Sequence, residues 1–302
     1  MRTGDFEYQL PSELIAQTPI EPRDHSRLMV LDRLTGAIAH RRFDDITDYL
    51  RVGDLLICNE SRVIPARLLA RRADTGGRLE ILLLKEIAEG TWETLVKPGK
   101  RARPGTRLIL GPRVEGGGWR GLPLPATLNP QPSTLVTAVV LARTEAGGRV
   151  IRFSDPSALD ELGAMPLPPY IKAPLLCSER YQTVYSRPKG SAAAPTAGLH
   201  FTPELLDRLK IMGVQLGFVT LHVGLDTFRP VEEDDAEAHV IHSEFCELGQ
   251  EVADLINRAR VENRRVIAVG TTTVRALESA ARVEGGWWRV ESGNRPLNPP
   301  PS

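Results

Sequence analysis

Residues 265–281, RVIAVGTTTVRALESAA, place an apolar strand directly before a helix. The run RVIAVG at 265–270 is expected to form a strand that leads directly into the next element. The three threonines that follow Gly270 open a helix over 271–281. Because strand–helix units of this kind build layered α/β domains, the stretch predicts an α/β fold.

The sequence around this unit supplies the rest of an α/β domain. Thr202 and Pro203 suit the N-cap and the first position of a helix that ends near Gly213. We also expect strands at 55–59, 214–224 and 244–248 and a helix at 250–263. Together these elements predict a domain with a mixed sheet.

A different pattern interrupts these elements between residues 62 and 152. Short apolar runs alternate there with glycine and proline, which is typical of a small all-β barrel or sandwich. We therefore predict an inserted β-barrel domain at 62–152 and a discontinuous α/β domain formed by 1–61 and 153–302. The Gly/Pro-rich stretch at 111–133 is expected to be a loop.

The composition places the chain in a broad class. It has 302 residues, 41% of them hydrophobic and 25% charged, as in ordinary globular proteins. The 38 Lys and Arg residues balance 38 Asp and Glu residues, so the net charge does not indicate a nucleic-acid partner. The sequence has no apolar run of membrane-spanning length and no secretory signal pattern. Three widely spaced cysteines fit a reducing compartment, and we expect a cytoplasmic protein.

The strand–helix junction at 270–273 is a candidate anion site. Backbone N–H groups, hydroxyls and the positive end of the helix dipole converge at such a junction, and Arg275 lies one turn further on. An ordinary capped helix explains the same residues, and the sequence leaves both interpretations open.

Four of the six histidines lie between residues 200 and 242. His239 and His242 have a spacing found in metal sites, and Glu244 is close by, but the cysteines supply no convincing third ligand. A histidine-based metal hydrolase is therefore one alternative function. A structural role is the other interpretation of such histidines.

The histidines at 200, 222 and 242 stand at the ends of expected elements, where an imidazole can transfer a proton near neutral pH. The small residues at 196–198 would let a ligand approach the backbone beside His200. In the expected barrel, the stretch KPGKRARPGTR at 97–107 has no acid. It fits either a phosphate-binding strip or a solvated rim.

Several long motifs of this chain resemble those of one enzyme family. They are SAAAPTAGLHFT, FVTLHVGLDTFRPV, HVIHSEF, RVIAVGTTTVRALES, DFEYQLPSELIAQTPIEPRDHSRLMVLDR, GDLLICNESRVIPARL, LVKPGKRARPG, LPPYIK and ERYQTVYS. From about residue 3 to residue 281 the chain resembles the S-adenosylmethionine:tRNA ribosyltransferase-isomerases of queuosine biosynthesis. The resemblance implies an α/β domain interrupted by a β-barrel.

The resemblance also implies an enzyme that uses S-adenosylmethionine as a co-substrate, with no permanently bound cofactor and no metal. Such enzymes transfer and isomerise the ribosyl moiety onto 7-aminomethyl-7-deazaguanine at the tRNA wobble position, giving epoxyqueuosine, adenine and methionine. The implied partners are this tRNA and S-adenosylmethionine, and we expect a monomer without membrane contact. The sulfonium acidifies the C5′ hydrogens and activates sulfur as a leaving group. The protein must then supply a base and exclude water.

The resemblance suggests roles for individual residues. The catalytic candidates are His200, His222, His242 and Glu244, of which the last two would form an acid/base pair. The substrate-binding candidates are Thr196, Ala197, Gly198, Gly224, Thr227, Gly270, Thr271, Thr272, Arg275 and Tyr170. The candidates for tRNA contact are Asn59, Arg62, Arg67, Lys97, Lys100 and Arg101.

Within these sets, residues 196–198 would form a wall for the adenosylmethionine donor, with His200 at its reactive edge. The junction at 270–272 and Arg275 would hold the methionine carboxylate or a tRNA phosphate. Tyr170 would stack on a base.

The chain departs from the family pattern at Asp226 and Ile241, where glycine and methionine are more usual. The larger departure follows Ala281, where 282–302 is rich in proline and is expected not to form a packed element. This tail resembles the product of a frameshift or premature stop. An inactive truncated homologue that retains tRNA or nucleoside binding is therefore the alternative function.

Overall fold

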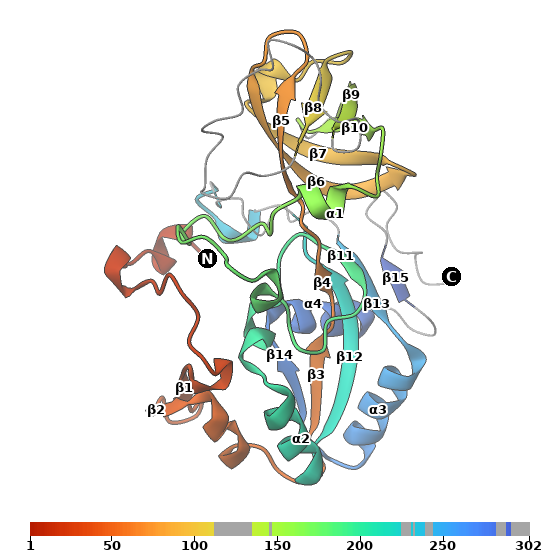
Figure 1. Ribbon diagram of the computed structural model, residues 1–302. Coiled ribbons are helices and arrows are strands. Elements are labelled where there is room, and N and C mark those ends of the chain that lie inside the picture. Colours follow the sequence, from red (N-terminus) through yellow and green to blue (C-terminus); the bar gives the residue numbers. More distant parts are fainter. Residues whose placement is uncertain are drawn as a thin grey trace. The chain divides into compact units, whose positions relative to one another are not determined.

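The structure is a computed structural model, which describes residues 1–111, 135–144, 147–224, 231, 233–238, 244–281 and the strand at 288–290. It divides into two compact units, Met1–Arg62 with Pro168–Ser302 and Val63–Leu167 (Figure 1). Each unit has a hydrophobic core of its own. None of the helices in the described ranges is long and apolar enough to cross a membrane.

The second unit is a closed antiparallel barrel of six strands in the order β10-β7-β6-β5-β8-β9. Alternate side chains are buried along its strands, so one side of each strand fills the interior. The expected β-barrel is confirmed. Its strands are β5 (Arg67–Arg72), β6 (Arg78–Ala88), β7 (Thr91–Lys97), β8 (Arg107–Leu110), β9 (Val136–Arg143) and β10 (Arg149–Phe153).

This unit extends to Leu167, beyond the expected boundary at residue 152. The short helix α1 (Leu159–Leu162) buries Leu159 in the barrel core. The backbones of Arg67 and Ala164 also exchange two hydrogen bonds, of 3.1 and 2.8 Å. Most of the expected loop at 111–133 lies outside the described residues.

The first unit is built on a mixed five-stranded sheet in the order β14-β3-β12-β13-β15. The strands β3 (Leu55–Asn59), β12 (Gln215–His222) and β14 (Val266–Val269) are parallel. The strand β13 (Phe245–Leu248) pairs antiparallel with β12, and β15 (Trp288–Val290) pairs antiparallel with β13. The predicted mixed α/β sheet is confirmed. The tail at 282–302 was expected not to form a packed element, but β15 pairs with β13 over three residues.

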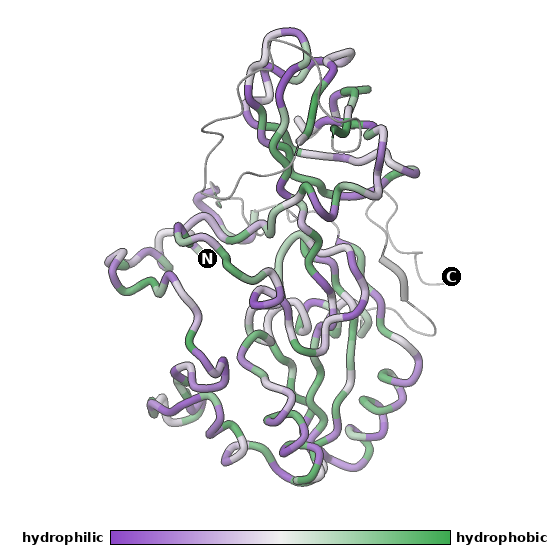
Figure 2. Tube along the Cα trace, viewed as in Figure 1, coloured by the Kyte–Doolittle hydropathy of each residue, from purple (hydrophilic) through white to green (hydrophobic). Residues whose placement is uncertain are grey.

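Helices cover both faces of this sheet. On one face, α2 (Pro203–Ile211) packs Leu205, Leu206 and Leu209 with Leu56 and Cys58 of β3. On the other face, α3 (Gln250–Val261) and α4 (Thr271–Ala281) pack with the alternate residues of β3 and β12. Because both of its faces are covered, β3 is buried along its whole length, and Figure 2 shows the hydrophobic residues along the central strands.

Shorter elements complete the first unit. The hairpin of β1 (Arg27–Leu31) and β2 (Ile38–Arg42) precedes β3, and β11 (Lys189–Ser191) pairs with β4 (Arg62–Val63). The short 3₁₀ helices of the two units are η1 (Thr3–Phe6), η2 (Ser12–Leu14), η3 (Arg23–His25), η4 (Phe43–Asp48), η5 (Gly99–Arg101), η6 (Ser178–Tyr181), η7 (Thr196–His200) and η9 (Ala236–Ala238).

Candidate active site

The candidate site lies at the sheet edge where the parallel strands end. Because β3, β12 and β14 are parallel, their carboxyl ends meet at one edge, which is where open α/β sheets bind ligands. The segment η7 reaches this edge, since a Cβ built on Gly270 would lie 3.1 Å from the Cβ of Ala197. The structure therefore brings the expected motifs at 196–198 and 270–272 side by side.

At the strand–helix junction, two of the three threonines form hydrogen bonds with neighbouring parts of the same unit. Gly270 has a φ of +84°, in the left-handed region that favours glycine. The hydroxyl of Thr272 accepts a hydrogen bond from Asn59 Nδ2 at 3.2 Å, and that of Thr273 donates to the last carbonyl of β14 at 2.7 Å. Thr271 is exposed at the first position of α4, so its hydroxyl and the helix N-terminus are available to an anion.

Asn59 is part of the framework of this edge. Its Nδ2 donates to the Leu221 carbonyl at 3.0 Å and to Thr272, and its Oδ1 accepts from the N–H groups of Ser61 and Leu221 at 3.0 and 3.1 Å. The residue is 1% exposed. The amide of Asn59 is therefore bonded inside the unit, and its expected contact with tRNA stays a prediction.

His222 is the last residue of β12 and is held between two other segments. Its ring stacks on Phe245, with centroids 5.2 Å apart and planes inclined by 21°. Gly190 also lies against the ring, where a Cβ would come within 2.7 Å of Nε2. Burial lowers the pKa of His222, which favours the neutral imidazole that can accept a proton. Among the described residues, the buried Nδ1 has no hydrogen-bond partner.

Glu244 forms a clamp beside His222. Its Oε1 accepts the N–H of Gly224 at 2.8 Å, and its Oε2 accepts from Arg275 Nη1 at 2.6 Å. The carboxylate side chain is 9% exposed and the arginine 38%. The clamp ties β13, α4 and the end of β12 together. The expected acid/base pair of Glu244 with His242 stays a prediction, because His242 lies outside the described residues. The contact with Glu244 occupies the arginine that was expected to hold an anion.

Some expected residues cannot be placed at this edge. Thr227 and His242, like His239, Asp226 and Ile241, lie outside the described residues. Within the part of the chain that the structure describes, no three His, Cys, Asp or Glu side chains are grouped as metal ligands.

His200 has different neighbours from His222. Its Nδ1 lies 2.7 Å from the Ser26 hydroxyl, and its ring centroid lies 5.1 Å from that of Phe43. Burial is the main cause that lowers the pKa of His200, and the positive charge of Arg23 also lowers it. Among the described residues, no hydrogen bond or ring contact joins the two histidines, so the structure does not bring them together.

The three small residues at 196–198 differ in how accessible they are to a donor molecule. A Cβ on Gly198 would lie 2.1 Å from the Tyr185 hydroxyl and 2.9 Å from Cγ2 of Thr183. The close approach on the Cβ side of Gly198 is therefore made by this chain itself, and the contact of Gly198 with the donor stays a prediction. Thr196 is exposed and Ala197 is half-buried, so these two remain candidates at the surface of the edge.

The residues expected to contact tRNA differ in their availability. In the first unit, Arg62 is bound by Glu179 and by the Ser186 hydroxyl, the latter at 3.0 Å, whereas Tyr170 is 54% exposed. In the barrel unit, Arg67 Nε lies 3.1 Å from Glu80 Oε1. Lys97, Lys100 and Arg101 are exposed in that unit.

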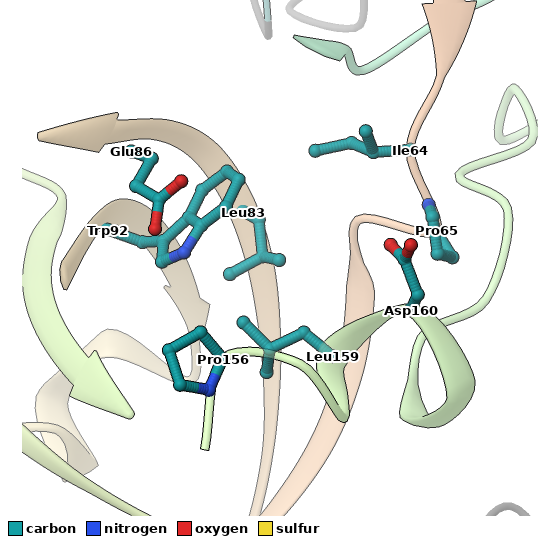
Figure 3. A pocket seen from close by; sticks show the side chains of 8 residues that line it. All are labelled: Ile64, Pro65, Leu83, Glu86, Trp92, Pro156, Leu159 and Asp160. Carbon is teal, nitrogen blue, oxygen red and sulfur yellow. The ribbon is translucent and has the colours of Figure 1, made fainter. Parts of the chain in front are cut away.

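The barrel unit also has a cavity of about 120 Å³, shown in Figure 3. It is lined by Ile64, Pro65, Leu83, Glu86, Trp92, Pro156, Leu159 and Asp160. It contains none of the expected site residues. A shallow groove of about 690 Å³ in the first unit, between α2 and the segment at 184–187, contains none of them either.

Sequence reasoning missed the residues that hold the histidines. Phe245 follows Glu244 directly in the HSEF motif, and an aromatic residue there was the available signal for a stacking partner. Gly190 has a φ of +146°, a requirement that one sequence does not reveal. Ser26 and Phe43 lie more than 150 residues from His200 in the chain, so no local pattern connects them.

Comparisons with known proteins match this chain to a family model and to several named relatives. A family model described as "Queuosine biosynthesis protein" matches residues 3–295. The S-adenosylmethionine:tRNA ribosyltransferase-isomerase of Symbiobacterium thermophilum is 53% identical over 289 residues, which cover 94% of this chain and 79% of the relative. The protein of that name from Clostridioides difficile is 50% identical over 300 residues, covering 96% and 82%. A crystal structure of S-adenosylmethionine tRNA ribosyltransferase from Thermotoga maritima is 37% identical and covers 99% of this chain and 80% of that one, with a TM-score of 0.43.

Proposed function

Because this chain belongs to the queuosine biosynthesis protein family, we propose that it is an S-adenosylmethionine:tRNA ribosyltransferase-isomerase. It transfers and isomerises the ribosyl moiety of S-adenosylmethionine onto 7-aminomethyl-7-deazaguanine at the tRNA wobble position. Epoxyqueuosine is formed, and adenine and methionine leave. The observation that carries this function is the identity of 50–53% with enzymes of that name over at least 94% of the chain.

The alternative of an inactive truncated homologue is not favoured. The chain covers 79% and 82% of two relatives, and the family match continues past Ala281 to residue 295. In addition, the tail at 282–302, which was expected not to form a packed element, contributes the strand β15 to the sheet by pairing with β13.

For proton transfer, His222 is the candidate that its surroundings support best. The ring lies at the end of the parallel strand β12, at the edge of the sheet where open α/β sheets bind ligands. Its lowered pKa favours the neutral form, which a base that removes a C5′ proton from the sulfonium donor must have. His200 has a lowered pKa as well, but its Nδ1 is engaged by Ser26, which suits a supporting role.

For substrate binding, Thr271 and the first turn of α4 are suited to an anion, such as the methionine carboxylate or a tRNA phosphate. Thr196, Ala197 and Gly224 would line the same edge. In the barrel unit, Lys97, Lys100 and Arg101 would bind backbone phosphates, and in the first unit the exposed Tyr170 would stack on a base. The protein acts on a tRNA that carries the aminomethyl base, as a cytoplasmic monomer that needs no resident cofactor.

Release of adenine tests this function. The purified chain is incubated with S-adenosylmethionine and an anticodon stem-loop that carries 7-aminomethyl-7-deazaguanine, and free adenine is measured by mass spectrometry. Adenine that appears only with this RNA supports the proposal, and release should fall by at least about 100-fold in His222→Gln. Equal release from unmodified RNA, or none from either RNA, would contradict it.

A further inference from the structure

Arg149 is a buried cation that the proposed chemistry does not use. It is the first residue of β10 and is 7% exposed. Burial lowers its pKa, and the nearby charge of Arg143 lowers it further. Among the described residues its hydrogen-bond partners are all carbonyl oxygens. A charge placed this way is costly unless its hydrogen bonds are satisfied, so its position calls for an explanation.

The guanidinium joins two turns of the barrel. Nη1 donates to the carbonyls of Gly147 and Gly148, both at 2.7 Å, and Nη2 donates to that of Gly99 at 2.6 Å. Nε donates to the carbonyl of Ala102. Gly99 begins η5, and Ala102 follows it directly, so the planar fork holds both ends of this turn.

The turn held by Arg149 is the basic segment of the barrel. Lys100 and Arg101 lie within it, and Lys97 and Arg103 lie on either side, all four exposed. Ala102, in contrast, is completely buried. The backbone carbonyls at both ends of the turn are thus bound by the buried guanidinium of Arg149, while the cationic side chains of the turn are exposed to solvent.

We propose that Arg149 is a positioning residue for tRNA: it fixes η5 so that the surrounding cations face RNA phosphates in one arrangement. This inference rests on the proposed function. Its own positive charge, directly beneath the turn, adds to the potential that attracts the phosphates. A lysine at this position keeps the charge but lacks the planar fork, and a methionine lacks both.

The test compares three variants in binding to the anticodon stem-loop over a range of salt concentrations. Arg149→Met should weaken binding about tenfold and make the salt dependence shallower, because fewer phosphates are contacted at once. Arg149→Lys should show an intermediate loss of about threefold. Arg152→Met is the matched control: it removes an exposed charge from the same strand and should change the affinity by less than about twofold.

Steady-state kinetics separate positioning from general damage to the fold. Arg149→Met should raise KM for the RNA and leave KM for S-adenosylmethionine and kcat unchanged. The inference would be overturned by equal RNA affinities of Arg149→Met and Arg152→Met, or by an equal rise of both KM values. If Arg149→Met does not fold, an Arg149→Lys variant with wild-type RNA affinity would also overturn it. A wild-type protein that neither binds nor modifies the RNA would instead defeat the proposed function itself.

Discussion

At the scale of single residues, the structure separates side chains that build the site from side chains that are available to a substrate. Asn59 and Glu244 both carry polar groups at the carboxyl edge, yet each is engaged by neighbours far away in the sequence. The amide of Asn59 meets Leu221, and Glu244 meets Arg275. One sequence contains the residue types of the edge but not the distances between them. The types of polar group at the edge were therefore predictable, whereas it was not predictable which side chains are bonded to one another and which are available to a substrate.

Gly198 provides a direct test of the packing at η7. In Gly198→Ala the new Cβ would collide with the Tyr185 hydroxyl, so we expect unfolding in urea to need about 2–3 kcal/mol less free energy. Gly4→Ala is the control, because nothing lies within 4 Å of a Cβ at Gly4. Equal stability of the two variants would show that the contact between Gly198 and Tyr185 is wrong.

The two half-buried histidines should make stability depend on pH. Burial lowers the pKa values of His200 and His222, so the unfolded chain binds protons first as the pH falls. Their contribution to stability is complete above the unfolded value of about 6.5 and is lost progressively below it. Urea midpoints from pH 8 to pH 5 should therefore fall, and the fall should be smaller in His222→Gln.

His40→Gln, which replaces an exposed histidine of β2, is the matched control variant. A midpoint that rises on acidification through pH 6 in the wild type would contradict the burial of the two rings.

At the scale of elements, the positions of strands and helices were easier to predict than the elements with which they pair or pack. Apolar runs of four to eight residues located β3 and β12, and the N-cap of α2 was visible in Thr202, which accepts the N–H of Leu205 at 3.1 Å. The end of the barrel unit was harder, because Leu159 is recruited to the barrel core by packing and not by a periodic pattern. The strand β15 was missed because its pairing with β13 overrides the irregular composition around it.

The ion pair between Arg275 of α4 and Glu244, the residue before β13, should contribute measurably to the free energy of unfolding. Arg275→Met leaves the carboxylate of Glu244 without its cation, and we expect a loss of about 2 kcal/mol, below the value for a fully buried pair because Arg275 is 38% exposed. Urea unfolding measures this loss. Arg33→Met, in an exposed turn, should cost less than about 0.5 kcal/mol.

A second substitution then tests whether the loss comes from an uncompensated charge. Glu244→Gln in the Arg275→Met background removes that charge and keeps an acceptor for the N–H of Gly224, so part of the stability should return. Strict additivity of the two changes would rule out a direct interaction between the side chains.

At the scale of the whole molecule, the described residues form three hydrophobic clusters, one inside the barrel unit and one on each face of the sheet of the first unit. The fold class followed from the sequence because two periodicities, strand–helix alternation and short punctuated strands, occupy separate stretches. A closed barrel leaves no unpaired edge, so the unit Val63–Leu167 should fold without the rest of the chain.

The isolated Val63–Leu167 fragment is expected to give a β-type circular dichroism spectrum and one cooperative thermal transition. The same fragment with Ile81→Asp should not fold, because a charge would be placed at a fully buried position of the barrel. A wild-type fragment without a cooperative transition would show that the barrel depends on the other unit.

Transfer of a ribosyl group by this chain can be followed with isotope in the donor. S-adenosylmethionine labelled with ¹³C in all ribose carbons is incubated with the wild-type protein and the aminomethyl-modified stem-loop, and the RNA is analysed by mass spectrometry. If the ribosyl group is transferred, the labelled ribose carbons enter the RNA, and unlabelled adenine and methionine are released. RNA that gains only a methyl group, with the ribose label retained in S-adenosylhomocysteine, would contradict this transfer.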